Sequence, residues 1–139
     1  MKTRVQSHVA YQLLYHIVWI PKYRKKVLVP GVSSYLDKVI RTYLQDRYPD
    51  VVVEEMNVQV DHVHILLVVP PKYSVSKVVG DIKSNSSRLL RKKFEYLRRG
   101  SSSLWSVGYY VSSVGLDEQR IRKYVRYQEN QDKGQLIKL

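Results

Sequence analysis

The stretch 51–69, VVVEEMNVQVDHVHILLVV, decides the fold. Residues 51–60 and 62–69 are rich in β-branched and other apolar side chains, which favour β-strands. Asp61 separates the two segments at the position of a tight turn, and the Pro70–Pro71 pair ends the second one. The sequence therefore predicts an antiparallel hairpin near the middle of the chain.

Two further strands are predicted, one on each side of this hairpin. The first covers residues 8–20, where alternate apolar side chains share one face and Pro21 ends the strand. The alternating residues are Tyr11, Leu13, Tyr15, Ile17 and Trp19. A basic loop, residues 22–26, follows. The other strand covers residues 104–113, ahead of Gly115.

Two helices are predicted between these strands. The first begins near Pro30, with Ser33 or Ser34 as a candidate N-cap. It ends before Pro49, because a residue that precedes proline disfavours the helical conformation. The second helix covers residues 74–97 and carries an apolar stripe at helical spacing.

A final helix is predicted from residue 117 to about residue 131. The element order is then βαββαβ with an added C-terminal helix. The simplest fold for this order is an α+β domain with a four-stranded antiparallel sheet, ferredoxin-like or RRM-like, with helices on one face. We expect residues 1–139 to form a single domain, because the length suits one domain and no linker interrupts the chain.

The composition is that of a globular protein with a strong surplus of positive charge. Hydrophobic residues make up 44% of the chain, which argues against disorder. The absence of cysteine excludes disulfides, thiolate metal sites and cysteine nucleophiles. Twenty-four Lys and Arg against twelve Asp and Glu give a net charge of +12, which favours nucleic acid as the partner. No apolar run approaches the ~20 residues needed to span a bilayer, so we expect no membrane association and a cytoplasmic location.

The candidate DNA-binding residues lie in the first basic loop and on the second helix. They are Lys22, Arg24, Lys25, Lys83, Arg88, Arg91 and Lys92. A run of charges is also typical of an ordinary solvated face, and that interpretation stays open. Tyr23, Tyr73 and Trp105 are candidates for stacking on unpaired bases, although Trp105 is better explained as a core residue.

His62 and His64 flank Val63 at the start of the third predicted strand. Because strand side chains alternate between faces, both imidazoles point the same way, roughly 6–7 Å apart at the backbone. That separation allows both to bind one metal ion. Two hydrogen-bonded structural histidines explain the pattern equally well. Asp61 is either a partner of one imidazole or an ordinary turn residue.

The final helix offers a third ligand for such a metal. Asp117, Ile121, Tyr124 and Gln128 share one helical face. If that face packs over the histidines, Gln128 supplies an amide oxygen to the metal and Tyr124 lies one turn away. The alternative is that Ile121 and Tyr124 are core residues and Gln128 is solvated.

Three segments of the chain carry a family resemblance. They are DHVHILL at 61–67, LW at 104–105 with GYYVS at 108–112, and IRKYVRYQ at 121–128. In this order they resemble the single-tyrosine HUH transposases of small bacterial and archaeal insertion sequences (TnpA-like). The resemblance covers nearly the whole chain.

The resemblance implies a DNA transposase that cleaves single-stranded DNA near short hairpins at the element ends. By its motifs, His62, His64 and Gln128 bind a divalent metal, and Tyr124 attacks to give a 5′-phosphotyrosine and a free 3′-OH. It also implies a homodimer. Nitrogen and oxygen ligands without thiolate suit Mg²⁺ or Mn²⁺, and Zn²⁺ also accepts them. Tyr127 is a second candidate nucleophile, and the spacing of Tyr124 to Gln128 favours Tyr124.

Two alternative functions stay open at the level of the sequence. One is a non-catalytic, RRM-like nucleic-acid-binding module, which needs neither a metal nor a covalent adduct. The other is a domesticated HUH nuclease that keeps the chemistry and mobilises no element of its own.

Overall fold

The computed structural model describes residues 4–6, 9–11, 13–99, 103–113 and 118–137. Its central feature is a four-stranded antiparallel sheet with the strand order β4-β5-β3-β6. The strands are β3 (Leu14–Trp19), β4 (Val52–Gln59), β5 (His62–Val68) and β6 (Tyr110–Ser112). The helices are α1 (Pro30–Arg47), α2 (Val75–Lys93) and α3 (Glu118–Ile137). The predicted α+β fold, with βαββαβ order and an added C-terminal helix, is confirmed.

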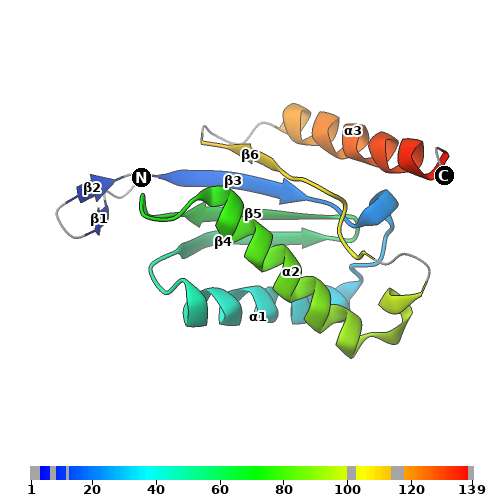
Figure 1. Cartoon of the computed structure of the whole chain (residues 1–139), viewed down its shortest axis with the longest axis horizontal. Helices are drawn as coiled ribbons and strands as arrows, with labels where there is room; N and C mark the ends of the chain where they lie inside the picture. Colours follow the sequence, from blue (N-terminus) through cyan, green and yellow to red (C-terminus); the bar gives the residue numbers. More distant parts are fainter. Residues whose placement is uncertain (1–3, 7–8, 12, 100–102, 114–117, 138–139) are drawn as a thin grey trace.

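The helices divide between the two faces of the sheet, with α1 and α2 on one face and α3 on the other (Figure 1). The main hydrophobic core lies beneath α1 and α2. There Ile17 of β3 is paired with Ile65 of β5, and Trp19 with Val63, all without solvent exposure. Among the described residues, no helix is long and apolar enough to cross a membrane.

The predicted central hairpin is formed by β4 and β5. Gln59 pairs with His62 across the turn at residues 60–61, and a register shift lies between Val53 and Glu55. Val63, Ile65 and their neighbours at alternate positions enter the core, so this register fixes which face each histidine occupies.

The long first strand predicted over residues 8–20 is wrong in its extent. Residues Val9–Tyr11 form β2, which pairs with β1 (Arg4–Gln6) in a separate two-stranded sheet. Only β3, from Leu14 onward, joins the main sheet. Apolar alternation indicates strand conformation but does not identify the partner strand, so one pattern covered two strands.

The predicted N-cap of α1 is also wrong. The helix begins at Pro30, whose fixed φ and missing N–H suit the first helical turn, and Val29 occupies the cap without a side-chain hydrogen bond. Ser33 and Ser34 lie inside the first turn, where their hydroxyls donate to the carbonyls of Pro30 and Gly31 at 3.0 and 3.1 Å. The predicted end before Pro49 is confirmed.

The second helix is shorter than predicted. Ser74 is its N-cap, and its Oγ accepts from the backbone N–H of Lys77 at 3.0 Å. Phe94 adopts extended backbone angles and ends α2 at Lys93, after which a separate 3₁₀ helix, η2 (Glu95–Arg98), follows. The predicted helix was too long because it included the residues of η2.

Most of the strand predicted over residues 104–113 is irregular backbone. Only Tyr110–Ser112 pairs with β3, while Trp105 forms an isolated bridge with Pro21. Gly108 has a φ of 92°. The ammonium of Lys83 donates hydrogen bonds to the carbonyl oxygens of Ser106 and Gly108, at 2.9 and 2.7 Å. These carbonyls point at Lys83 and not at a neighbouring strand. Helix α3 runs to Ile137, beyond the predicted end, and residue 117 lies outside the described residues.

Candidate active site

His62 and His64 lie on the face of the sheet that α3 covers. Val63 between them is fully buried beneath α1 and α2, so the imidazoles on either side of it belong to the opposite face. His64 is the cross-strand partner of Val18, and Val18 packs against Val125 of α3. The expected same-face arrangement of the two histidines is therefore present, next to the final helix.

A chain of polar contacts connects His62 to α3. The His62 Nδ1 lies 3.0 Å from Asp61 Oδ1, and Arg24 Nε donates to the other carboxylate oxygen at 3.0 Å. The Arg24 guanidinium also lies 3.9 Å from Glu129, the residue after Gln128. Burial raises the pKa of Asp61, but the bond to His62 and the Arg24 charge outweigh it and hold that pKa below its ordinary value.

His16 is a functional candidate that the sequence reasoning missed. Its Nδ1 lies 3.4 Å from His64 Nε2, and the two rings stack with centroids 5.6 Å apart. Burial, and then the neighbouring His16, lower the pKa of His64, which favours the neutral imidazole that binds metals. The signal was available, because His16 falls between Tyr15 and Ile17 and so lies on the opposite face from them.

Tyr124 packs into a small cluster beside the histidines. Its ring lies 5.9 Å from that of Tyr110, against Val18, Ile20 and Val125. Its hydroxyl is buried and has no hydrogen-bond partner among the described residues. Burial, with a smaller contribution from Asp132, raises the pKa of this hydroxyl.

The second tyrosine candidate has a different environment. Tyr127 is 59% exposed, whereas the Tyr124 hydroxyl is enclosed on the sheet side of α3. A buried hydroxyl without a partner costs roughly 1–3 kcal/mol. Of the other residues expected on this helical face, Asp117 and the side chain of Ile121 lie outside the described residues.

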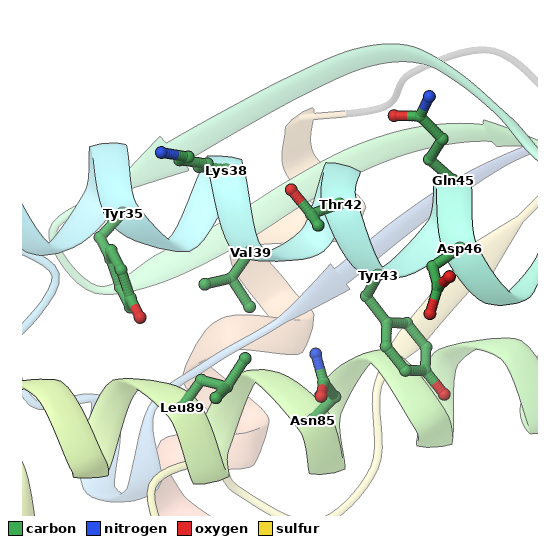
Figure 2. A pocket seen from close by; sticks show the side chains of 9 residues that line it. All are labelled: Tyr35, Lys38, Val39, Thr42, Tyr43, Gln45, Asp46, Asn85 and Leu89. Carbon is green, nitrogen blue, oxygen red and sulfur yellow. The ribbon is translucent and has the colours of Figure 1, made fainter.

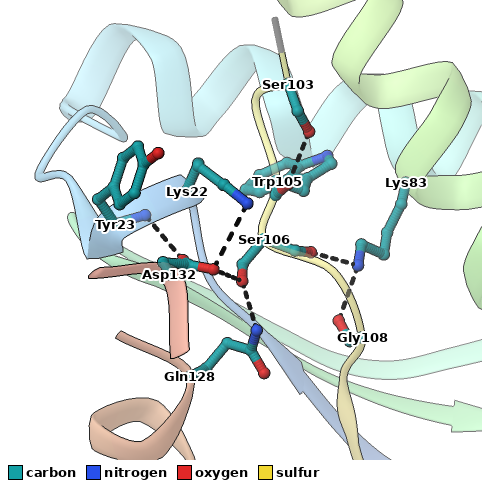
Figure 3. Close-up of polar contacts among 9 residues, drawn as sticks. All are labelled: Lys22, Tyr23, Lys83, Ser103, Trp105, Ser106, Gly108, Gln128 and Asp132. Carbon is teal, nitrogen blue, oxygen red and sulfur yellow. Dashed lines mark hydrogen bonds and ion pairs between the residues drawn. The ribbon is translucent and has the colours of Figure 1, made fainter. Parts of the chain in front are cut away.

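Gln128 belongs to a buried polar chain (Figure 3). Its Nε2 donates to Ser106 Oγ at 2.7 Å, and Ser106 Oγ donates to Asp132 Oδ1 at 2.8 Å. The other oxygen of Asp132 accepts the backbone N–H of Tyr23 at 2.8 Å, and Lys22 Nζ lies 3.6 Å from Asp132 Oδ1. The exposed fractions of Gln128, Ser106 and Asp132 are 9%, 1% and 0%. The sequence reasoning missed both Ser106 and Asp132.

The donors on this face suit a divalent cation. His62 directs Nδ1 at Asp61, which leaves Nε2 as its donor to a metal, and Gln128 directs its amide oxygen away from Ser106 (Figure 3). No cluster of three or more His, Cys, Asp or Glu suited to a metal occurs within the described ranges. The Gln128 amide oxygen lies about 3.9 Å from the position that a Cβ on Gly108 would occupy. The set His62, His64 and Gln128 therefore stays a prediction for a metal on this face.

The predicted DNA-binding residues fall into two separate groups. Lys22, Arg24 and Lys25 lie at η1 (Lys22–Arg24), which contacts α3 and borders the candidate site. Lys83 is half-buried against the 106–108 loop, and the remaining three residues lie on α2, in the opposite layer (Figure 1). They are Arg88, Arg91 and Lys92. The structure thus brings the η1 cations and Lys83, but not the other three α2 cations, to the site (Figure 3). DNA binding by either group stays a prediction.

The three aromatic candidates also differ in position. Trp105 is a core residue, as expected: it packs edge-on against Trp19 at 5.9 Å, and its Nε1 donates to Ser86 Oγ at 3.1 Å. Tyr73 packs edge-on against Tyr48. Tyr23 lies at η1, with the ammonium groups of two neighbouring lysines above its ring.

A groove of about 760 Å³ lies between α1 and α2, in the layer away from the histidines. Figure 2 shows Tyr35 and Tyr43 of α1 and Asn85 and Leu89 of α2 pointing into the space between the helices. Asp46 is the one carboxylate among its lining residues, and no histidine lines it. The lining of this groove therefore lacks the histidines found on the α3 side of the sheet.

Comparisons with known proteins agree with the motif resemblance. Residues 9–128 match the protein family described as "Transposase IS200 like". The chain is 33% identical over 132 residues to the transposase for insertion sequence element IS200 of Salmonella typhimurium, covering 91% of this chain and 84% of that one. The chain belongs to the IS200-like transposase family, whose members are DNA-cleaving and strand-transferring enzymes.

Two solved structures extend this result to the fold. A crystal structure assigned as a transposase from Deinococcus radiodurans R1 superposes with a TM-score of 0.81 at 29% identity, covering 92% of this chain and 98% of that one. The REP-associated tyrosine transposase bound to a REP hairpin gives a TM-score of 0.54 at 15% identity, covering 88% and 70%. The second likeness concerns the fold alone.

Proposed function

We propose that this transposase cleaves and rejoins single-stranded DNA at the ends of an insertion sequence, in a metal-dependent reaction with Tyr124 as the nucleophile. The supporting observation is the Tyr124 hydroxyl, buried and without a partner among the described residues, on the same face of the sheet as His62 and His64. A scissile phosphate that enters between them would give this hydroxyl its partner.

In the proposed step, the Tyr124 oxygen attacks the phosphorus and forms a new P–O bond. The bond from phosphorus to the 3′ oxygen breaks, and that oxygen leaves with a proton as a free 3′-OH. The product is a 5′-phosphotyrosine, which keeps the energy of the phosphodiester for rejoining, so no nucleotide cofactor is needed.

The environment of Tyr124 explains why a metal is part of this proposal. A tyrosine hydroxyl ionises at a pKa of about 10 in water, and burial raises the pKa of Tyr124 further. A divalent ion, Mg²⁺ or Mn²⁺, held by His62, His64 and Gln128 would neutralise the phosphate charge and stabilise the leaving oxygen. The contact of His62 with Asp61, which Arg24 also binds, restrains this imidazole and supports its proposed role as a ligand.

The partner in this proposal is single-stranded DNA with hairpin ends. The net charge of +12 supports a nucleic acid, and the η1 cations Lys22, Arg24 and Lys25 border the site. The REP-associated transposase that shares this fold is bound to a hairpin, which supports hairpin recognition here. We further propose that residues 1–139 act as a single domain and that the protein is a homodimer.

A covalent-adduct assay tests the proposal. The protein is incubated with hairpin-bearing single-stranded DNA from candidate element ends and Mg²⁺ or Mn²⁺, and SDS-resistant adducts are resolved on a denaturing gel. Wild type and Tyr127→Phe should form the adduct, whereas Tyr124→Phe and His64→Ala should not, and His64→Ala should still bind the DNA.

Two results would contradict the proposal. If wild type binds the DNA but forms no adduct with any candidate end, the non-catalytic binding module is favoured. If Tyr124→Phe keeps the adduct and Tyr127→Phe loses it, the nucleophile is Tyr127.

A further inference from the structure

The hydrogen bonds from Gln128 to Asp132 can run in only one direction. The Asp132 carboxylate accepts the Tyr23 N–H and lies 3.6 Å from the Lys22 ammonium, so it acts as an acceptor, and the hydroxyl proton of Ser106 points at its Oδ1, 2.8 Å away. The Ser106 oxygen then needs a donor, and of the two ends of the Gln128 amide only the NH₂ group provides one, at 2.7 Å. The position of Asp132 therefore determines that Gln128 Oε1 faces away from Ser106 (Figure 3).

Asp132 is itself held in place by a strained turn. Its Oδ2 accepts the backbone N–H of Tyr23 at 2.8 Å, and Tyr23 and Arg24 have φ values of 60° and 53°. Residues other than glycine rarely adopt this left-handed backbone conformation. Each one costs on the order of 1–3 kcal/mol of stability unless its surroundings support it. The same turn aims the Arg24 side chain at Asp61, beside His62. One turn thus supports both the amide and one imidazole of the candidate metal site.

We propose that Ser106 and Asp132 are positioning residues that orient the Gln128 amide oxygen toward a divalent metal ion. The inference rests on the proposed function, since it assigns a role to the chain Gln128–Ser106–Asp132 only if Gln128 is a metal ligand. Neither residue touches the metal. Ser106 fixes which end of the amide faces outward, and Asp132 fixes the direction of the Ser106 hydroxyl.

A titration with Mn²⁺ alone tests this role without any DNA reaction. Binding is measured as the loss of the EPR signal of free Mn²⁺. Ser106→Ala removes the partner that distinguishes the two ends of the amide. We expect Mn²⁺ to bind about 10- to 100-fold more weakly, the usual effect of losing a group that orients a ligand. Gln128→Ala measures the effect of removing the ligand itself.

Ser86→Ala is the matched control. Ser86 is also a buried serine with two hydrogen bonds, one accepted from Trp105 Nε1 and one donated to the Lys83 carbonyl, and it lies outside the chain of bonds to Gln128. Circular dichroism checks that each variant is folded. Ser86→Ala should alter stability about as much as Ser106→Ala and leave the Mn²⁺ affinity unchanged.

A reversed chain gives a second test that does not depend on one substitution. In Gln128→Glu, two carboxylates compete for the single hydroxyl proton of Ser106. In the double variant Gln128→Glu with Asp132→Asn, the amide NH₂ group introduced by the second change can donate to Ser106 Oγ, and Ser106 can donate to the new carboxylate. The double variant should therefore bind Mn²⁺ more tightly, and be more stable, than the Gln128→Glu single variant, which already carries the added carboxylate.

The outcomes separate the inference from the proposed function. If Gln128→Ala does not weaken Mn²⁺ binding, both fail. If Gln128→Ala weakens binding while folded Ser106→Ala and Asp132→Asn bind like wild type, only the positioning role fails. The role also fails if Ser86→Ala loses as much affinity as Ser106→Ala, or if the double variant shows no recovery.

Discussion

The two faces of the sheet are built in opposite ways. The face beneath α1 and α2, here the core face, is a continuous apolar layer in which Ile17, Trp19 and Ile65 have no solvent exposure. The face beneath α3, here the site face, has a much smaller apolar cluster around Val18 and Ile20. Its other side chains include histidines, a buried polar chain, and a tyrosine whose hydroxyl has no partner in the described part of the chain.

This difference separates stability from chemistry within one sheet. Apolar burial on the core face stabilises the fold in proportion to the area removed from water. On the site face, the cost of burying polar groups is offset only by their hydrogen bonds, and within the described ranges the Tyr124 hydroxyl, like Trp19 Nε1 in the core, lacks even that compensation. If Tyr124 is the proposed nucleophile, the protein tolerates a stability cost at the position of its reaction.

The largest effect should come from removing the Tyr124 hydroxyl. Tyr124→Phe should reduce DNA cleavage by about a thousandfold or more, because the nucleophile is lost. The same change removes a buried polar group that gains no hydrogen bond from the described residues, so the free energy of unfolding should stay the same or rise by about 1 kcal/mol. Cleavage rates and urea denaturation measure the two effects.

Tyr127→Phe is the control for this prediction, since Tyr127 lies on the same helix and is 59% exposed. Tyr127→Phe should leave both the cleavage rate and the free energy of unfolding unchanged. A marked loss of stability in Tyr124→Phe would mean that the hydroxyl has a structural partner, and the contrast between the faces would weaken.

Two consecutive residues of β5 test the contrast most directly. Ile65 points into the core face, and His64 points to the site face. Ile65→Ala should lower the free energy of unfolding by about 2–5 kcal/mol through cavity formation. His64→Ala should change stability by less than about 1 kcal/mol and reduce cleavage by about a hundredfold or more.

The readouts for this pair are denaturation curves and cleavage rates normalised to folded protein. Folded Ile65→Ala should cleave at close to the wild-type rate. If His64→Ala is as destabilising as Ile65→Ala, the histidine is a structural member of the sheet, as the alternative interpretation of the His-x-His pattern holds.

The fold was largely predictable because short-range patterns determine it. The hairpin at 51–69, the end of α1 before Pro49 and the order of elements follow from periodicity and from proline. The errors fall where a distant group decides the local structure. The Lys83 ammonium binds the carbonyls of Ser106 and Gly108, and β1 pairs with residues 9–11 of the predicted first strand.

The site was predictable only in part, for the same reason. Strand alternation placed His62 and His64 on one face, and the spacing of Tyr124 to Gln128 came from the family resemblance. Ser106 and Asp132 are separated by 26 residues, and no periodicity links a serine in an irregular loop to an aspartate late in a helix. Only the packing of α3 against η1 and the loop brings them together.

The smallest predicted effect concerns Lys83. This residue of α2, on the core face, binds the 106–108 loop, which contacts the site face. Burial lowers its pKa from 10.5 to about 8, while Asp132 opposes this shift. Between pH 8 and pH 10 the unfolded chain therefore binds more protons at this residue than the folded protein does. The free energy of unfolding should rise with pH across this window.

Above about pH 10, the ionisation of tyrosines lowers the free energy of unfolding and opposes the contribution of Lys83. The hydrogen bond to Asp81 raises the pKa of Tyr48 to about 12, so the unfolded chain loses that proton first and stability falls with pH. The comparison is therefore best made as a difference between wild type and Lys83→Gln, with Lys38→Gln on α1 as the control. Urea denaturation at pH 8, 9 and 10 should show a rise in wild type and in Lys38→Gln that is reduced in Lys83→Gln. Equal slopes in all three proteins would mean that Lys83 is as well solvated as a surface lysine, and that the border between the faces is open to water.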